Sequence, residues 1–286
     1  MGQPQKLREL LGSGTIVSAP GAPDSLAARL VEQAGFPAIY MTGFGATASR
    51  LGRPDIGLLT QTEMTTHARD MVRAVSIPVI ADADTGYGGP ANIVRTMEEY
   101  AQAGVAAVHF EDQVSPKRCG QLAGVRVIPA EEAARRLRCA MAAQGAAGPL
   151  VIGRTDALGA DGIEEAIRRA KLYQDAGVDL VFVDGIKKIA DVEAVARHVS
   201  GPKVVSIVDG NETVALSAPM LQEMGFSVVF YAVTALFAAA KAMQDALAIL
   251  KNDGTPRAAA SQLMTYAEFS ALVDLPHFQE LDHQFG

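Results

Sequence analysis

The stretch IEEAIRRAKLYQDAGVDLVFVDG, residues 163–185, joins a helical pattern to a short apolar run through a glycine. Four residues of its first part are spaced to line one helix face, with charged residues opposite: Ile163, Ile167, Ala170 and Leu172. Gly177 follows, where the left-handed end of a helix favours glycine. The run at 180–185 is apolar without strict alternation, which is typical of a parallel strand covered on both faces. The stretch therefore predicts one helix and one strand of a repeating βα unit.

The same order of helix, glycine and strand recurs along the chain. Glycine separates a helical pattern from an apolar run at Gly35, Gly104, Gly177 and Gly225. Short apolar runs occupy residues 14–20, 37–43, 78–84, 106–112, 150–157, 180–185, 203–208 and 227–233. Eight such units predict a (β/α)8 TIM barrel in a single domain over residues 1–286. A doubly wound open sheet uses the same units and is the alternative.

Two further helical patterns follow the last apolar run, at residues 235–254 and 265–275. They belong to a helical extension over about 235–286, which we include in the barrel domain. We expect the second of these helices to lie outside the barrel and to pack on another subunit.

The composition limits the classes of function. The 286 residues are 49% hydrophobic and 20% charged, which is ordinary for a folded globular protein. Because the formal net charge is −7, the chain lacks the basic excess that nucleic-acid binding needs. Two cysteines suit a reducing compartment, and we expect the cytoplasm. No apolar run reaches the length of a membrane span, and the N-terminal MGQPQKLREL lacks the apolar segment of a signal peptide, so we expect no membrane partner.

Ionisable residues stand at the ends of the predicted strands, where a barrel places its catalytic groups. They are Asp82, Asp84, Glu111, Asp112, Arg154, Asp156, Asp184 and Asp209. Carboxylates at one rim repel one another unless a cation lies among them. Asp82 and Asp84 are two apart in a strand, so we expect both on one side, and their oxygens suit Mg²⁺, with Mn²⁺ as an alternative. Capping of the next helix or of a loop amide is the other role open to this pair.

Arg154 is the only cation among these strand ends. It either pairs with Asp156 or binds a substrate carboxylate through two parallel hydrogen bonds, and we favour the second role. His109 is the only histidine within a predicted strand. We interpret it as a packed core residue and not as a zinc ligand.

The connection after the fourth strand, residues 113–132, is much longer than the roughly 2–6 residues of an ordinary βα loop. Long loops at this end of a barrel commonly cover the site. Cys119 lies in it between basic residues and a glycine, a setting that favours the thiolate and makes the thiol a candidate for proton transfer. An incidental loop cysteine is the alternative. The other cysteine, Cys139, lies in a helical pattern and is interpreted as a core residue.

Five motifs follow one another in a characteristic order: YMTGFG (40–45), LGRPDIG (51–57), DADTGYG (82–88), HFEDQVSPKRCG (109–120) and GRTDA (153–157). In order and spacing the chain resembles the isocitrate lyase / phosphoenolpyruvate mutase superfamily along nearly its whole length. The KRCG motif after a strand ending in Glu-Asp resembles the carbon–carbon lyase branch of that superfamily.

The resemblance implies a (β/α)8 barrel with C-terminal helices exchanged between subunits, usually in a homotetramer, and Mg²⁺ at a 2-oxo acid site. It implies a lyase that cleaves a methylisocitrate-like or alkylmalate-like 2-hydroxy acid into pyruvate or glyoxylate and a second carboxylic acid. Asp84 would be the closest metal ligand, with Asp82 and Glu111 acting mainly through water. The remaining residues that it places at the site are Thr42, Gly43, Phe44 and Arg154 for a carboxylate, Gly120 and Asp184 for the substrate, Asp55 beside the reacting centre and Cys119 as proton donor.

Four positions depart from the pattern of the lyases: Gln121, Val125, Asp184 and Ser206. The lyases resemble one another in carrying His, Lys, Glu and Asn there. Loss of a His and a Lys weakens recognition of an extra carboxylate, since each charge-assisted hydrogen bond is worth roughly 1.5–3 kcal/mol. We therefore expect a substrate smaller or less charged than methylisocitrate, such as a substituted malate. A phosphonomutase or phosphonate hydrolase, an oxaloacetate hydrolase or decarboxylase, and a non-catalytic 2-oxo acid binder remain the alternatives.

Overall fold

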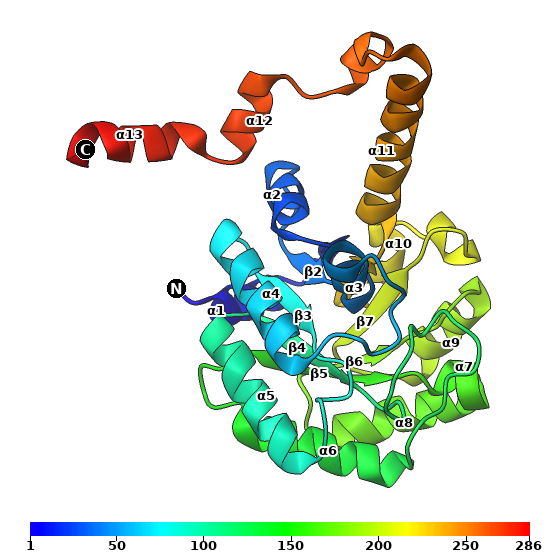
Figure 1. The fold of residues 1–286 in the computed structure, drawn as a ribbon. Helices are drawn as coiled ribbons and strands as arrows, with labels where there is room; N and C mark the ends of the chain where they lie inside the picture. Colours follow the sequence, from blue (N-terminus) through cyan, green and yellow to red (C-terminus); the bar gives the residue numbers. More distant parts are fainter. The chain divides into compact units, whose positions relative to one another are not determined.

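The computed structural model describes residues 1–286, which divide into two compact units, Met1–Thr234 and Ala235–Gly286. In the first unit eight parallel strands pair in sequence order, and the eighth pairs with the first to close a barrel (Figure 1). The strands are β1 (Val17–Ala22), β2 (Ile39–Met41), β3 (Val79–Asp82), β4 (Ala107–Glu111), β5 (Leu150–Thr155), β6 (Leu180–Val183), β7 (Lys203–Ile207) and β8 (Val228–Tyr231). Seven of the eight predicted runs contain a strand, the first run at 14–20 overlaps β1, and the closed ring excludes the open sheet.

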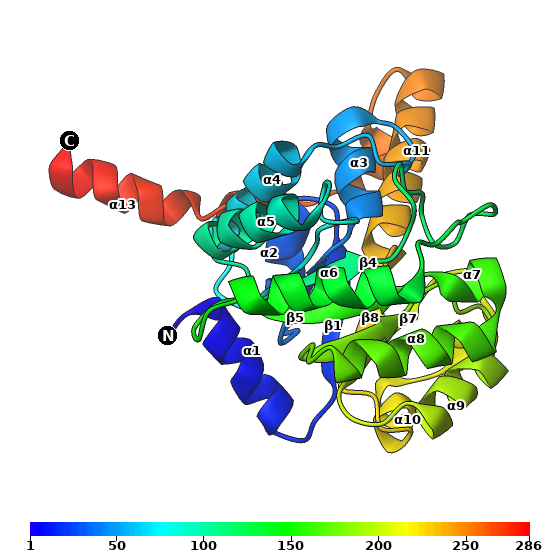
Figure 2. The same cartoon turned by 90° about the horizontal axis from the view of Figure 1, so that it is seen from below.

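Helices surround this ring of strands (Figure 2). Those of the first unit are α1 (Gln3–Gly12), α2 (Ser25–Gln33), α3 (Gly43–Leu51), α4 (Gln61–Ala74), α5 (Pro90–Ala103), α6 (Ala130–Ala143), α7 (Ala157–Asp161), α8 (Ile163–Asp175), α9 (Ile189–His198) and α10 (Ala218–Glu223), with a short 3₁₀ helix at Glu212–Ala215.

Two apolar clusters account for the burial of both faces of the strands. The inner cluster fills the barrel with side chains such as Ile152, Phe182 and Phe230, and Leu7 of α1 packs into it. The outer cluster lies between strands and helices and contains residues such as Val108 and Val181. Burial on both faces explains why the strands lack alternation in the sequence.

The four predicted helix-ending glycines have positive φ angles, between 82° and 91°. Gly104 is the end residue of α5 in the left-handed conformation, and its amide donates to Tyr100 and Ala101 carbonyls. A side chain there would be strained, which is why glycine marks the end of the helix.

The buried face of α8 differs from the predicted one. Ala166, Ala170 and Tyr173 are fully buried, whereas Ile163 and Ile167 lie at the margin of the core. Of the four predicted residues only Ala170 is fully buried, and Leu172 also lies at the margin of the core.

The second unit consists of α11 (Thr234–Asp253), the 3₁₀ segment Arg257–Gln262, α12 (Tyr266–Leu272) and α13 (Leu275–Phe285). The helix predicted at 235–254 is confirmed. The helix predicted at 265–275 is wrong in extent, because α12 ends near Asp274, which has a left-handed φ of 60°, and α13 then begins. That the extension forms one domain with the barrel stays a prediction. No helix of the chain has the length and apolar character needed to cross a membrane.

Candidate active site

The predicted rim of charged residues is present at the carboxyl ends of the strands. Asp82 ends β3, Glu111 ends β4, and Arg154 pairs in register with Glu111 one residue before the end of β5. All three are buried. Asp184 follows β6 and is also buried, whereas Asp209 after β7 is exposed and only accepts a hydrogen bond from Thr234 over 2.8 Å.

Asp82 and Asp84 reach the same region, but not through the alternation of a strand. The strand ends at Asp82, and Asp84 has a left-handed φ of 46°. Asp82 Oδ1 accepts from the Asp84 amide over 2.9 Å, and its Oδ2 accepts from the Gly43 amide over 3.1 Å. Asp82 therefore also binds loop amides, the alternative role of the pair. A side chain at position 43 would meet Asp82 Oδ2 at 2.5 Å, so this approach requires glycine.

Lys117 supplies a buried cation at the rim. Its Nζ lies 2.7 Å from Asp55 Oδ1 and 2.7 Å from Asp84 Oδ1. Burial lowers the pKa of this ammonium, but the surrounding carboxylates raise it more, so the pKa stays well above its usual value. For the Asp84 carboxyl group, burial has the opposite effect and raises the pKa to about 6, although the Lys117 ammonium opposes this shift.

Lys117 is a site residue that the sequence pattern does not identify, because in the sequence it is only a basic neighbour of Cys119. The signal available was a lysine in a loop that must lie over an acidic rim. In such a setting an ion pair with the rim is the expected role.

The prediction that basic neighbours favour the Cys119 thiolate is wrong. Burial raises the pKa of this thiol to about 11, and the Lys117 ammonium binds Asp55 and Asp84 instead. The Cys119 amide donates to Asp55 O over 3.0 Å, which fixes the thiol segment beside Asp55. A neutral thiol is the form that can donate a proton.

Arg154 binds three carboxylates. Its Nε and Nη2 donate to the two oxygens of Asp156 over 2.9 and 2.8 Å, and Nη2 also lies 2.6 Å from Asp184 and 3.4 Å from Glu111. In the structure Arg154 therefore pairs with Asp156, which is the alternative that we did not favour. Binding of a substrate carboxylate by Arg154 stays a prediction.

Gly120 lies directly on this cluster. A Cβ there would lie 2.5 Å from Asp156 Oδ1, closer still to Asp184 Oδ2, and 3.0 Å from Arg154 Nη2. Only a residue without a side chain lets the loop approach so closely. The loop residue Gly120 and the rim residue Asp184, both expected at the substrate, are therefore in contact range of each other.

Glu111 has no hydrogen-bond partner for either carboxylate oxygen, although it is buried. Burial raises its pKa well above the usual value, against the attraction of Arg154. Buried carboxylate oxygens that lack a hydrogen bond fit a cation or ordered water. No group of three or more His, Cys, Asp and Glu side chains in the chain is placed to hold a metal directly. A metal ion would therefore need water among its ligands.

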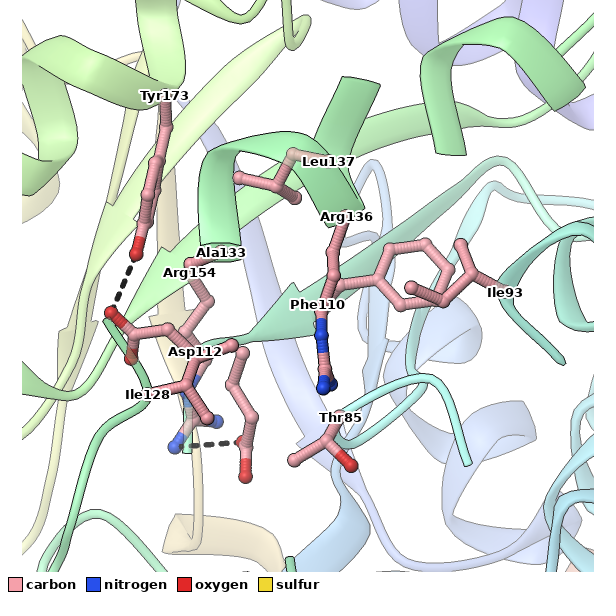
Figure 3. Close-up of a pocket in the computed structure, with 11 residues that line it drawn as sticks. Thr85, Ile93, Phe110, Asp112, Ile128, Ala133, Arg136, Leu137, Arg154 and Tyr173 are labelled. Atoms are coloured by element: carbon pink, nitrogen blue, oxygen red, sulfur yellow. Dashed lines mark hydrogen bonds and ion pairs between the residues drawn. The ribbon is translucent and has the colours of Figure 1, made fainter. Parts of the chain in front are cut away.

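A second layer behind the rim supports Asp156. Asp112 accepts from Thr155 Oγ1, the Asp156 amide, Arg169 and the Tyr173 hydroxyl over 2.6–3.0 Å. Figure 3 shows the Tyr173 hydroxyl directed at Asp112, in a small pocket that Arg154 also lines. Arg169 lies on α8 and was not predicted, because a helix arginine is ordinarily exposed.

The other residues expected at the site lie as follows. Thr42 precedes α3, its hydroxyl caps the first turn, and Gly43 and Phe44 begin the helix. His109 is confirmed as a core residue, since it is fully buried and its Nε2 lies 3.0 Å from the Tyr40 hydroxyl. The core prediction for Cys139 is wrong, because this thiol is only half-buried at the surface of α6.

Similarity to known proteins extends over most of the chain. The family model described as phosphoenolpyruvate phosphomutase matches residues 7–251. The chain belongs to this family. 2,3-Dimethylmalate lyase of Eubacterium barkeri is 38% identical over 281 residues, which are 98% of this chain and 97% of that protein.

Solved structures agree with this membership. A crystal structure of 2,3-dimethylmalate lyase, described as a member of the PEP mutase/isocitrate lyase superfamily, is 38% identical and superposes with a TM-score of 0.93 over 100% of this chain and 96% of that one. A phosphonopyruvate hydrolase in complex with oxalate and Mg²⁺ is 29% identical, with a TM-score of 0.90 over 100% and 99% of the two chains. Membership of this superfamily supports an enzyme of the carbon–carbon lyase type, as the motifs predicted.

The four departures from the lyases of the superfamily also have defined places. Gln121 accepts from Asn211 Nδ2 over 3.1 Å, and its carbonyl accepts from Lys187 over 3.1 Å. Val125 is a buried residue of the loop itself, and Ser206 is buried in β7. With Asp184, which follows β6 and lies beside Arg154, the four departures lie on the loop, just after β6 and in β7.

Proposed function

We propose that the protein is a Mg²⁺-dependent lyase that cleaves a 2-hydroxy dicarboxylate of the alkylmalate kind into a 2-oxo acid, such as pyruvate or glyoxylate, and a second carboxylic acid. One observation carries the proposal. The loop holds the thiol of Cys119 beside a buried rim on which Lys117 and Arg154 lie among carboxylates, and burial raises the pKa of this thiol to about 11, which favours its neutral form. This arrangement combines a proton donor with the charges that a 2-oxo acid site needs.

The donor set fits a divalent ion. Both oxygens of Glu111 are buried without a hydrogen bond, and two further buried carboxylates lie at the end of the neighbouring strand β3, Asp82 as its last residue and Asp84 two residues beyond it. Asp84 would hold Mg²⁺ directly, with Asp82 and Glu111 acting through water, and Mn²⁺ could take the same place. When bound, the ion supplies a Lewis acid that stabilises negative charge on substrate oxygens.

The residues of the chain then have separate tasks. Thr42, Gly43 and Phe44 would receive the carboxylate of the 2-oxo acid at the start of α3, where backbone amides attract anions. Arg154 would stabilise negative charge from the opposite side. Asp55 orients Lys117 and the amide of Cys119, as its contacts to both indicate.

In the proposed reaction the enzyme takes one proton from the substrate hydroxyl and gives one proton to the departing fragment. The substrate loses its hydroxyl proton to a basic group of the site, and the adjacent C–C bond breaks. The electron pair of that bond leaves with the departing fragment, which a carboxylate stabilises. The S–H proton of Cys119 then converts this carbanion into the second carboxylic acid, and the closed loop keeps water away.

The surroundings of Arg154 favour a small or weakly charged second product. Asp156 and Asp184 already engage Nε and Nη2 of this arginine, and the loop position 121 carries an uncharged Gln. An additional carboxylate would meet buried negative charge there. Activity on 2-methylisocitrate equal to that on alkylmalates would contradict this inference.

We also infer a cytoplasmic homotetramer. The second unit exposes large apolar side chains on every helix, including Leu247, Leu250, Phe269 and Phe278. Exposed apolar surface of this extent is typical of subunit contacts. We propose that these helices pack on another copy of the chain.

The test is a panel of 2-hydroxy diacids with Mg²⁺, in which released pyruvate and glyoxylate are measured. The proposal expects release from at least one alkylmalate, and loss of release when the metal is chelated. Release of phosphate from a phosphonate in place of this would favour the phosphonate hydrolase, and release of oxalate from oxaloacetate would favour the hydrolase alternative. Binding of 2-oxo acid without any turnover would favour the non-catalytic binder.

A further inference from the structure

Gln113 opens the long loop, and its side chain is buried. The amide nitrogen donates to Arg118 O over 2.7 Å, and the amide oxygen accepts from Arg118 N over 3.0 Å. Gln113 also forms an antiparallel bridge with Val127 near the end of the loop. One side chain therefore pairs with both backbone polar groups of the residue between Lys117 and Cys119, as a neighbouring β-strand would.

The residues on either side of Arg118 have their own contacts with the rim. Lys117 binds Asp55 and Asp84 through its ammonium, and the Cys119 amide binds Asp55 O. The Arg118 side chain is exposed and takes no part in these contacts, since its guanidinium donates to Ala123 O over 3.2 Å. The Gln113 amide binds both backbone polar groups of Arg118 and, together with the bond from the Cys119 amide to Asp55 O, fixes the peptide units between the Lys117 and Cys119 side chains.

The chemistry of the pairing is specific to glutamine. At neutral pH a side-chain amide offers an N–H donor and a C=O acceptor side by side in one plane, as pairing with a backbone N–H and C=O requires. Glutamate lacks the donor at neutral pH, asparagine is one methylene shorter, and methionine has the length without either polar group. Both bonds are lost together when the amide is removed.

We propose that Gln113 is a positioning residue, and that its amide pair with Arg118 holds Cys119 and Lys117 in place over the rim. The catalytic consequence of this inference rests on the proposed lyase function, whereas the structural consequence does not. Without the pair, the segment 117–119 opens more often, and the half-buried thiol of Cys119 becomes more exposed to solvent. The protection of Cys119 is therefore the property to measure.

The experiment compares Gln113→Met with Gln144→Met, both in a Cys139→Ser background that leaves one thiol. Gln144 also makes two hydrogen bonds through its amide nitrogen, to Pro149 O over 3.1 Å and to Asp179 over 2.6 Å, but outside the loop. Alkylation of Cys119 by iodoacetamide should be about tenfold faster in Gln113→Met, because two hydrogen bonds no longer oppose opening. The Gln144→Met protein should be alkylated at the parental rate. Its melting temperature should fall by about as much as that of Gln113→Met.

Gln113→Asn provides a second variant if Gln113→Met does not fold, and we expect an intermediate alkylation rate. Equal alkylation rates in the parent and in the folded Gln113 variants would overturn the proposal. The proposal would also be overturned if Gln144→Met accelerated alkylation of Cys119 as much as Gln113→Met does. Loss of the fold in both Gln113 variants would overturn it as well, because Gln113 would then stabilise the barrel as a whole and not this segment of the loop. Where turnover exists, kcat should fall about 100-fold with little change in KM. The alkylation rate needs no substrate, so it remains decisive if no acid of the panel is cleaved.

Discussion

Lys117 and Arg154 are the two buried cations of the rim, and each contacts carboxylates from more than one element. The buried carboxylates around them are more numerous: Asp55, Asp82, Asp84, Glu111, Asp156 and Asp184. Burial is the main cause that raises the pKa of Glu111 and Asp184, and the neighbouring carboxylate of Asp156 raises it further. The excess of negative charge also explains why a divalent cation suits the site.

The reactivity of Cys119 should report its environment. Burial raises its pKa from 9.0 to about 11, so the thiolate fraction at pH 8 is very small. In a Cys139→Ser protein, the iodoacetamide rate should rise about tenfold per pH unit between pH 8 and pH 10 and level off near pH 11. The Cys119→Ser, Cys139→Ser protein gives the background. A rate that levels off below pH 9 would mean that basic neighbours do favour the thiolate.

Removal of the Lys117 charge should destabilise the metal-free protein. Lys117→Met leaves Asp55 and Asp84 buried without their cation, which costs about 3–5 kcal/mol of unfolding free energy. Urea denaturation in a chelating buffer measures this loss of unfolding free energy. The control is Lys187→Met, since Lys187 is exposed and donates to one carbonyl, and we expect a loss of at most about 1 kcal/mol. Equal losses in both variants would show that Lys117 is not an essential countercharge.

At the scale of elements, the strands deliver the carboxylates and the loop after β4 delivers the thiol. The loop residues 113–128 contact the rim through Asp55, and they contact the loops after β6 and β7 through Gln121. Backbone pairs between residues 112 and 128 and between 114 and 126 join the two ends of the loop. The loop is thus a defined element that contacts Asp55 and the segments after β6 and β7.

Docking of the loop should depend on the absence of a side chain at position 120. In Gly120→Ala, the new Cβ would collide with Asp156 and Asp184, so we expect kcat to fall about 100-fold while the barrel stays folded. Steady-state kinetics and proteolysis of the loop measure the two effects. Gly159→Ala is the matched control, because a Cβ there meets its nearest atom, in Val125, only at 4.0 Å. Normal activity of Gly120→Ala would exclude a docked loop in the reaction.

Much of the fold could be predicted from the sequence, because it depends on local patterns. Helix-ending glycines such as Gly177 and apolar strands repeat in order, and the charged strand ends then share one rim. Contacts between distant loops have no such pattern. The ion pairs of Lys117 and the burial of Arg169 depend on how separate segments meet. The left-handed conformation of Asp84 likewise ended the alternation on which the metal-ligand prediction was based.

At the scale of the whole molecule, the two units differ in how they bury apolar surface. The barrel buries its apolar side chains in two clusters, whereas the second unit buries only Ala259 and Leu272. Helices with this exposed apolar surface are expected to find their partner in another copy of the chain.

Assembly should therefore depend on the apolar residues of α11. Leu247→Lys and Leu250→Lys together place charges on a surface that is 64% and 45% exposed in the single chain, and we expect the tetramer to dissociate. Light scattering after gel filtration measures the mass. Asn252→Lys on the same helix is the control and should leave the tetramer intact. A tetramer that survives the double substitution would place the interface elsewhere.

The measurement closest to the central claim is turnover and binding by Cys119→Ser with the best alkylmalate of the panel. Loss of the proton donor should lower kcat by about 100-fold or more, within the range for one general acid, while calorimetry still detects pyruvate or oxalate binding in the presence of Mg²⁺. Cys139→Ser, with its thiol outside the site, should keep full turnover. Cleavage by Cys119→Ser at the parental rate would contradict the role of the thiol and, with it, the proposed lyase mechanism.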